Sequence, residues 1–251
     1  MKKQASQGLY DPRNEHDSCG VGFVVNVKGE PSHKIIEQGL EVLLSLAHRG
    51  ACGCEVNTGD GAGILIQTPH KFLHKVCEPL GIHLPAPGEY GVGMVFLPPE
   101  IHLRRKCEEM FQDVVQAEGQ RFLGWRTVPS VNDLLGETAK EEEPVVRQAF
   151  IGRSREIKDD LAFERKLYVI RRRTTSVVWS ARLPDASCFY IPSLSYKSIV
   201  YKGMLIANQV EQMFPDIEVS LFDLRLSAFD RFIYPRVIYR LARLHANSLH
   251  K

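Results

Sequence analysis

Apolar residues recur along this chain with two periods, one typical of helices and one of strands. Over residues 32–50 they follow helical spacing, with Ser32 at the expected start and Gly50 at the expected end of a helix. Residues 99–119 show the same pattern, with a proline at the start and a glycine at the end. Further helices are predicted over residues 70–77, 160–173 and 204–214.

Runs of β-branched and aromatic residues between glycines and prolines predict the strands. The first run, CGVGFVVNV at residues 19–27, has the composition of a buried strand, and Gly20 and Gly22 would let another backbone or a ligand approach closely. The glycine-rich stretch TGDGAG leads into a short apolar strand that Pro69 ends. Further strands are predicted over residues 90–98, 120–129, 146–153, 187–194 and 198–203.

The order of these elements indicates the fold class. Strand pairs are mixed with helices, and the strict alternation of a doubly wound parallel sheet is missing. We therefore predict an α+β layered sandwich in one domain. The acidic patch ETAKEEEP at residues 137–144 is expected to be a solvated connection within it.

Composition and charge exclude several classes of protein. The 251 residues are 44% hydrophobic and 25% charged, which is ordinary for a globular chain, and the formal net charge of +2 is too small to indicate nucleic-acid binding. No apolar stretch approaches the roughly 18 residues of a membrane span, and residues 1–18 lack the apolar middle of a secretory signal. We expect a cytoplasmic protein with neither nucleic acid nor membrane as a partner.

Six cysteines in such a chain are better read as reduced thiols than as a disulfide framework. Cys19 has two readings. It is either a buried thiol at the start of a strand or a nucleophile. If the polar residues 1–18 were removed, Cys19 would carry a free α-amine with a reference pKa of about 7.7–8.0, close enough to neutral to act as the base for its own thiol.

Several long motifs carry a family resemblance, in order and at similar spacing. They are GLYDPRNEHDSCGVGFVV, EPSHKIIEQGLEVLLSLAHRGACGC, TGDGAGILIQTPH, GEYGVGMVFLP, QAFIGR, FERKLYVIRR and FYIPSLSYKSIVYKGML. Together they resemble the N-terminal glutaminase domain of the large subunit of glutamate synthase. This domain is a class II glutamine amidotransferase of the N-terminal nucleophile group.

The resemblance implies an αββα sandwich, incomplete at its C-terminus, with Cys19 as the catalytic nucleophile after cleavage of a propeptide at residues 1–18. It implies glutamine as substrate, and release of ammonia for the synthesis of glutamate from 2-oxoglutarate. The implied partner is a synthase domain or small subunit. FMN and an iron–sulfur cluster are expected in that synthase region, and no cofactor is expected in this segment.

Arg49, in the sequence AHRGA, matches an arginine of the family that lies near the nucleophile. Its guanidinium suits the carboxylate of a free amino acid, because the planar fork binds a carboxylate bidentately. Two other roles stay open: Arg49 braces the cysteine loop, or it faces the negative end of the helix dipole.

No metal site is expected, although His70, His74 and Cys77 fall at spacings that would place them on one helix face. Arg171, Arg172 and Arg173 are predicted to lie on a solvated helix face, with a basic patch for acidic partners as the rival reading.

The resemblance covers roughly residues 8–222, with the amidotransferase domain predicted over residues 19–222. Residues 223–251 are predicted to be a divergent tail, which a frame change, truncation of a longer gene or genuine divergence would explain. The family's RFSTNT and HNGE motifs, which supply a carboxylate clamp and the oxyanion hole, are absent. Oxyanion-hole donors contribute on the order of 10²- to 10³-fold in rate, so weak activity is expected. The alternative is a catalytically inactive amidotransferase-like binding or regulatory module.

Overall fold

The computed structural model describes residues 20–29, 32–47, 57–59, 61–184 and 188–219, together with Glu55. Its helices are α1 (Lys34–Ser45), α2 (His70–Cys77), α3 (Ile101–Ala117), α4 (Glu137–Glu141), α5 (Asp160–Ser180) and α6 (Gln209–Met213), with short 3₁₀ turns at η3 (Glu78–Leu80) and η5 (Pro215–Glu218). Its strands are β1 (Ala62–Gln67), β2 (Tyr90–Leu97), β3 (Arg121–Thr127), β4 (Val145–Gly152), β5 (Tyr190–Ser195) and β6 (Ser198–Gly203).

The described strands form two antiparallel groups. Four strands pair in the order β3-β4-β2-β5, and β1 pairs with β6 in register from Ala62 opposite Gly203 to Gln67 opposite Ser198. Every residue of the central strand β2 is buried, because the strand has neighbours on both edges and packing on both faces. The two-residue turn Tyr196–Lys197 connects β5, in the first group, to β6, in the second.

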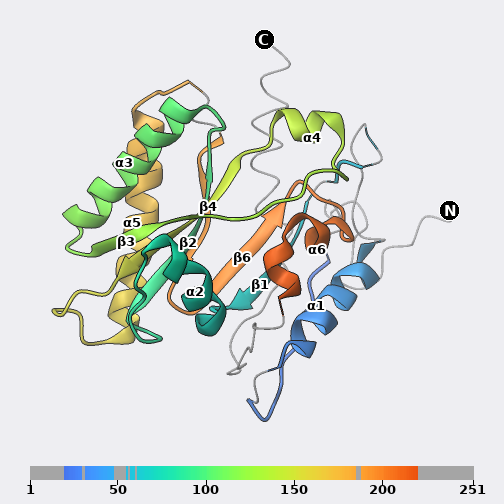
Figure 1. Ribbon diagram of the computed structural model, residues 1–251, viewed down its shortest axis with the longest axis horizontal. Helices are drawn as coiled ribbons and strands as arrows, with labels where there is room; N and C mark the ends of the chain where they lie inside the picture. Colours follow the sequence, from blue (N-terminus) through green and yellow to red (C-terminus); the bar gives the residue numbers. More distant parts are fainter. Residues whose placement is uncertain are drawn as a thin grey trace, which may run out of the picture.

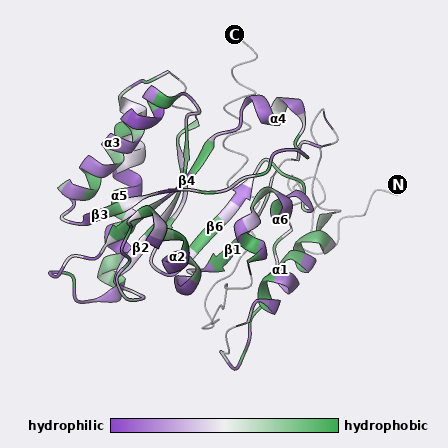
Figure 2. Ribbon diagram, viewed as in Figure 1, coloured by the Kyte–Doolittle hydropathy of each residue, from purple (hydrophilic) through white to green (hydrophobic). Residues whose placement is uncertain are grey.

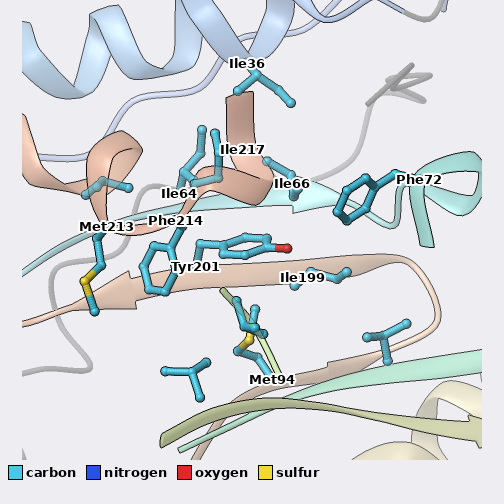
Figure 3. Close-up of a cluster of buried hydrophobic side chains, with 14 of the residues drawn as sticks. Ile36, Ile64, Ile66, Phe72, Met94, Ile199, Tyr201, Met213, Phe214 and Ile217 are labelled. Carbon is cyan, nitrogen blue, oxygen red and sulfur yellow. The ribbon is translucent and has the colours of Figure 1, made fainter. Parts of the chain in front are cut away.

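Helices cover both sides of these strands, as Figure 1 shows: α3 and α5 lie together on one side, and α1 and α6 lie beyond the β1–β6 pair. One buried hydrophobic cluster joins α1, the β1–β6 pair and one face of β2 and β4. In Figure 3, Ile36 of α1 points toward Ile64 and Ile217, while Met94 of β2 lies beneath Ile199. A second cluster packs the opposite face of the four-stranded sheet against α3 and α5.

The predicted α+β class is confirmed, and most elements lie where the sequence pattern places them. The helix predicted from Ser32 is α1, and the Ser32 side chain accepts a hydrogen bond from the backbone N–H of Lys34. The glycine-rich turn does lead into a short strand, β1, and the predicted helix over 70–77 is α2. Among the described helices, none is both long and apolar enough to cross a lipid bilayer.

Two local predictions are wrong, and a third is refined. Residues 20–27 form no strand: among the described residues none pairs with them in a ladder, and Phe23 and Val27 are 69% and 95% exposed. The acidic patch at 137–144 connects β3 to β4 with no buried side chain among its described residues, and it contains the short helix α4. The helix predicted over 204–214 shrinks to α6, because the Gln209 side chain accepts a hydrogen bond from the Ile206 N–H and holds the preceding residues in a turn.

A buried ion pair ties strand β3, in the middle of the chain, to η5, at the end of the described residues. The guanidinium of Arg126, in β3, donates two hydrogen bonds of 2.7 Å to the carboxylate of Asp216, in η5. Both side chains are about 95% buried. Arg126 also donates to Gln148 of β4, and Tyr201 of β6 donates to Asp216. Because each charge is neutralised and further hydrogen-bonded, the pair is tolerated in the interior.

Replacing Asp216 by Asn is expected to lower the free energy of unfolding by about 3–5 kcal/mol, because Arg126 would be left buried without a counter-charge. Urea unfolding followed by circular dichroism measures the change. The double variant Arg126→Met with Asp216→Leu should recover a large part of the loss, since neither charge then stays buried. Equal stability of Asp216→Asn and the parent chain would contradict this account of the pair.

Candidate functional site

The two site residues predicted from the sequence, Cys19 and Arg49, lie outside the described residues, as do Cys52 and Cys54. Their neighbours in the sequence are described. Gly20 directly follows Cys19, and Leu46 caps α1 three residues before Arg49. The surroundings of these neighbours are therefore the part of the candidate site that the structure describes.

Gly20 and Gly22 bring the chain after Cys19 into close contact with the C-terminal half of α1. A Cβ atom on Gly20 would lie 3.1 Å from the Cβ of Leu46, and one on Gly22 would lie 2.4 Å from a methyl carbon of Val42. Real Cβ atoms do not approach a neighbour as closely as the second value, so a side chain at position 22 would force this segment away from the helix. The sequence predicts close approach of another backbone or a ligand at Gly20 and Gly22, and in the structure the described atoms that come close are side-chain atoms of Val42 and Leu46 of α1 and its cap.

A small pocket lies between this segment, α1 and β1, and its walls are apolar. It is lined by Gly22, Phe23, Val24, Ile35, Ile36, Gly39, Val42, Ile64, Leu65 and Ile66. Binding sites for polar ligands contain a few polar groups that orient the ligand, and none of these side chains supplies one. We therefore interpret the pocket as a packing gap and not as a site for an amino acid.

The glycine-rich stretch before β1 is explained by packing. Gly59 lies against the backbone after β6, where a Cβ atom would come within 2.3 Å of the Leu205 carbonyl oxygen. Gln209 of α6 fastens the same region by donating hydrogen bonds to the carbonyl oxygens of Asn57 and Leu134. These contacts agree with the reading of TGDGAG as a turn.

The residues considered for zinc are not brought together as ligands. On α2, Cys77 is fully buried, and burial raises the pKa of its thiol to about 11. His74 is exposed, and His70 lies 3.0 Å from the hydroxyl of Tyr90. Within the described residues, no group of three or more His, Cys, Asp or Glu side chains has a metal-binding arrangement.

The described cysteines differ in how reactive their thiols can be. The thiolate is the nucleophile, and burial in apolar surroundings raises the thiol pKa and so disfavours the thiolate. Cys107 of α3 is fully buried like Cys77, and burial raises the pKa of its thiol to about 11. Both thiols are therefore protonated at neutral pH and shielded from reagents. Cys188 is partly exposed.

A cluster of charged and aromatic side chains that the sequence analysis missed lies beside β5. Lys202 of β6 is 3% exposed, and its ammonium donates a 3.3 Å hydrogen bond to the hydroxyl of Tyr190. Tyr190 also accepts a hydrogen bond from Arg171 of α5. We call Arg171, Tyr190 and Lys202 the cation cluster.

The prediction that Arg171 lies on a solvated helix face is wrong, while Arg172 and Arg173 are exposed as predicted. Arg171 is partly buried because it follows Ile170 and stands four residues after Leu167, two positions on the buried side of α5. The spacing from these two apolar positions could have predicted from the sequence that Arg171 is partly buried. Burial lowers the pKa of Arg171, and burial together with the nearby Arg171 charge lowers the pKa of Lys202 to about 7.

Comparison with known protein families assigns the chain to one family. The family described as "Glutamine amidotransferases class-II" matches residues 19–233, which is most of the sequence. The chain is a member of the class-II glutamine amidotransferases. The match begins at Cys19 and extends past residue 222 to include Arg231 and Phe232.

Three relatives in this family are much longer than the chain. It is 44% identical over 234 residues to the glutamate synthase [NADPH] large chain of Bacillus subtilis and 39% identical over 241 residues to the glutamate synthase [NADH] of Schizosaccharomyces pombe, with 92% of the chain covered in both. It is 34% identical over 229 residues, or 89% of its length, to a chloroplastic ferredoxin-dependent glutamate synthase 2 of Arabidopsis thaliana. The chain spans 15%, 11% and 14% of these three relatives.

We expect Gly22→Ala to destabilise the amidotransferase chain by about 1–3 kcal/mol, because its methyl group has no room against Val42. Urea unfolding measures the change. Gly39→Ala is the matched control: its methyl group would lie 3.3 Å from the flexible end of Ile64, inside a helix where alanine is favoured. Adding Val42→Ala to Gly22→Ala should cost less than Val42→Ala alone, and strict additivity would count against the contact.

The low pKa of Lys202 predicts a pH-dependent stability. An unfolded lysine titrates near pH 10.4, whereas Lys202 in the folded chain titrates near 7. Above pH 7 the unfolded state therefore binds more protons, and the contribution of Lys202 to the free energy of unfolding rises with pH. The slope should be visible between pH 7 and about 8, below the pH of about 8.5 at which unfolded cysteine thiols are half ionised.

Urea unfolding at several pH values tests this prediction by comparing the parent chain with Lys202→Met. The variant should lack the rise that Lys202 contributes. The free energy of unfolding of the parent should therefore increase relative to that of Lys202→Met as the pH increases. Lys197→Met is the control, because Lys197 is exposed in the β5–β6 turn, where it also lies over a tyrosine ring. A constant difference between Lys202→Met and the parent across this range would contradict the shifted pKa.

Proposed function

We propose that this chain hydrolyses glutamine and supplies ammonia for the synthesis of glutamate from 2-oxoglutarate, with Cys19 as the nucleophile. The observation that carries the proposal is the family match, which starts at Cys19, together with relatives named glutamate synthase that align with about nine-tenths of the chain. In such an enzyme, the ammonia released from glutamine by the amidotransferase domain would be the nitrogen source for the synthesis of glutamate.

The proposed chemistry needs no metal at the nucleophile. Cleavage of the Ser18–Cys19 bond gives Cys19 a free α-amine, which takes up the thiol proton as the sulfur attacks the side-chain carbonyl of glutamine. The amide nitrogen leaves as ammonia with that proton, and a thioester forms. Water then hydrolyses the thioester, releases glutamate and restores the thiol.

The contact between Gly20 and Leu46 supports a site at the C-terminal end of α1. Consecutive Cα atoms are 3.8 Å apart, so Cys19 is tethered to a residue that touches Leu46, and Arg49 follows Leu46 by three residues. We propose that Arg49 binds the carboxylate of glutamine there, because a guanidinium forms two parallel hydrogen bonds with a carboxylate.

The proposal extends to the architecture and the partner. The two strand groups with helices on both sides are compatible with an αββα sandwich, which we propose for the complete domain. We propose a synthase domain as the consumer of the ammonia, and we assign the FMN and the iron–sulfur cluster to that domain and not to residues of this chain.

Labelling with a diazoketone analogue of glutamine, followed by mass mapping, tests the nucleophile. We expect one equivalent of label, on Cys19, in a protein whose intact mass shows the loss of residues 1–18. Cys19→Ser should abolish labelling. Cys188→Ser, which removes the partly exposed thiol of the described region, should label like the parent.

Other outcomes of the same experiment decide against the proposal. Label on Cys188, or full glutaminase activity in a chain that still begins at Met1 or Lys2, would exclude Cys19 as an N-terminal nucleophile. Saturable binding of glutamine without label or ammonia release would instead favour the alternative, a catalytically inactive binding or regulatory module.

A further inference from the structure

The cation cluster contains positive charge that the described residues do not neutralise. Lys202 makes no ion pair with any described carboxylate, and its ammonium has the hydroxyl and ring of Tyr190 as neighbours, at 3.3 Å and 4.5 Å. Lysines this deeply buried are almost always paired with an acid. A neutral phenol satisfies one hydrogen bond but leaves the charge uncompensated.

Arg171 makes the imbalance larger. It approaches Tyr190 from α5, carries a second positive charge close enough to repel that of Lys202, and has no ion pair with a described carboxylate either. Two further described neighbours carry no charge: Phe96 of β2 packs beside the Tyr190 ring, and Gly63 of β1 stands opposite Lys202. No carboxylate among the described residues therefore pairs with either cation.

Lys202 lies where β1 and β6 approach each other closely. A Cβ atom on Gly63, its partner in the ladder, would lie 2.4 Å from the Cβ of Lys202 and 2.6 Å from the Tyr201 carbonyl oxygen, so the glycine allows the two strands to come this close. Figure 2 shows β6 hydrophobic over most of its length and hydrophilic at its arrowhead, and Lys202 is the penultimate residue of that strand.

We propose that Arg171 and Lys202, joined through Tyr190, bind a carboxylate. A carboxylate has two oxygens and one negative charge, so one oxygen can accept from the guanidinium while the other accepts from the ammonium. Arg171 and Tyr190 are both partly exposed, so the anion reaches the cluster from their side. The carboxylate is either a small free anion or an Asp or Glu side chain, and the test separates these sources.

Thermal unfolding in sodium acetate, against sodium chloride of equal ionic strength, tests for a free anion. We expect acetate at ten times its Kd to raise the Tm of the parent chain by about 3–6 °C beyond chloride. Lys202→Met and Arg171→Gln should each weaken this response about ten-fold or more. The matched controls are Lys197→Met and Arg172→Gln, which replace exposed neighbours and should respond like the parent.

Carbodiimide coupling with peptide mapping tests for a protein carboxylate. If Lys202 is held by an Asp or Glu, acetate should have no specific effect, and the reagent should join Lys202 to an acidic side chain in an amide crosslink. Arg171→Gln, which keeps the lysine, should reduce the yield of that crosslink. Absence of both an acetate response and a Lys202 crosslink overturns the proposal, as does an acetate response that Lys202→Met and Arg171→Gln leave unchanged.

Neither measurement uses glutamine or Cys19. A failed diazoketone experiment would therefore leave the carboxylate site standing, and loss of the acetate response in Lys202→Met with normal labelling of Cys19 would support both proposals separately.

Discussion

The ion pair between Arg126 and Asp216 is the interaction on which the described fold depends. It joins β3, in the four-stranded sheet, to η5, at the end of the described chain, and it is surrounded by Gln148 of β4, Tyr201 of β6 and the ring of Phe72 of α2. Leaving either charge unpaired in this interior would cost about 3–5 kcal/mol. The sheet therefore depends on the docking of residues 215–218, which ties strand β3, in the middle of the chain, to the last described element.

The sequence predicts the elements of this fold well where local signals are strong. Ser32 and the helical spacing after it define α1, Pro69 marks the end of β1, and the α+β class follows from the order of helices and strands. These features depend on residues near one another in the chain. Residues 20–27 were misjudged because a valine-rich run has strand propensity, whereas a strand also needs a partner.

The buried polar residues could not be predicted from the sequence, because their burial also depends on contacts between distant parts of the chain. Nothing local distinguishes Arg126 or Lys202 from a solvated residue, since their burial is caused by chain segments far away in the sequence. For the candidate site, the family resemblance indicated Cys19 and Arg49, and the described structure adds the contact of Gly20 with Leu46 between their neighbours. The glycines were informative: a side chain at position 22, 59 or 63 would collide with another part of the chain, and one at position 20 would make a tight contact.

The pairing of β1 with β6 has a consequence for synthesis on the ribosome. Ala62 and Gly203 are partners, so β1 emerges long before the strand that completes its ladder has been translated. Until then the apolar residues of β1 have no native neighbour on that edge, and such nascent strands are prone to aggregate.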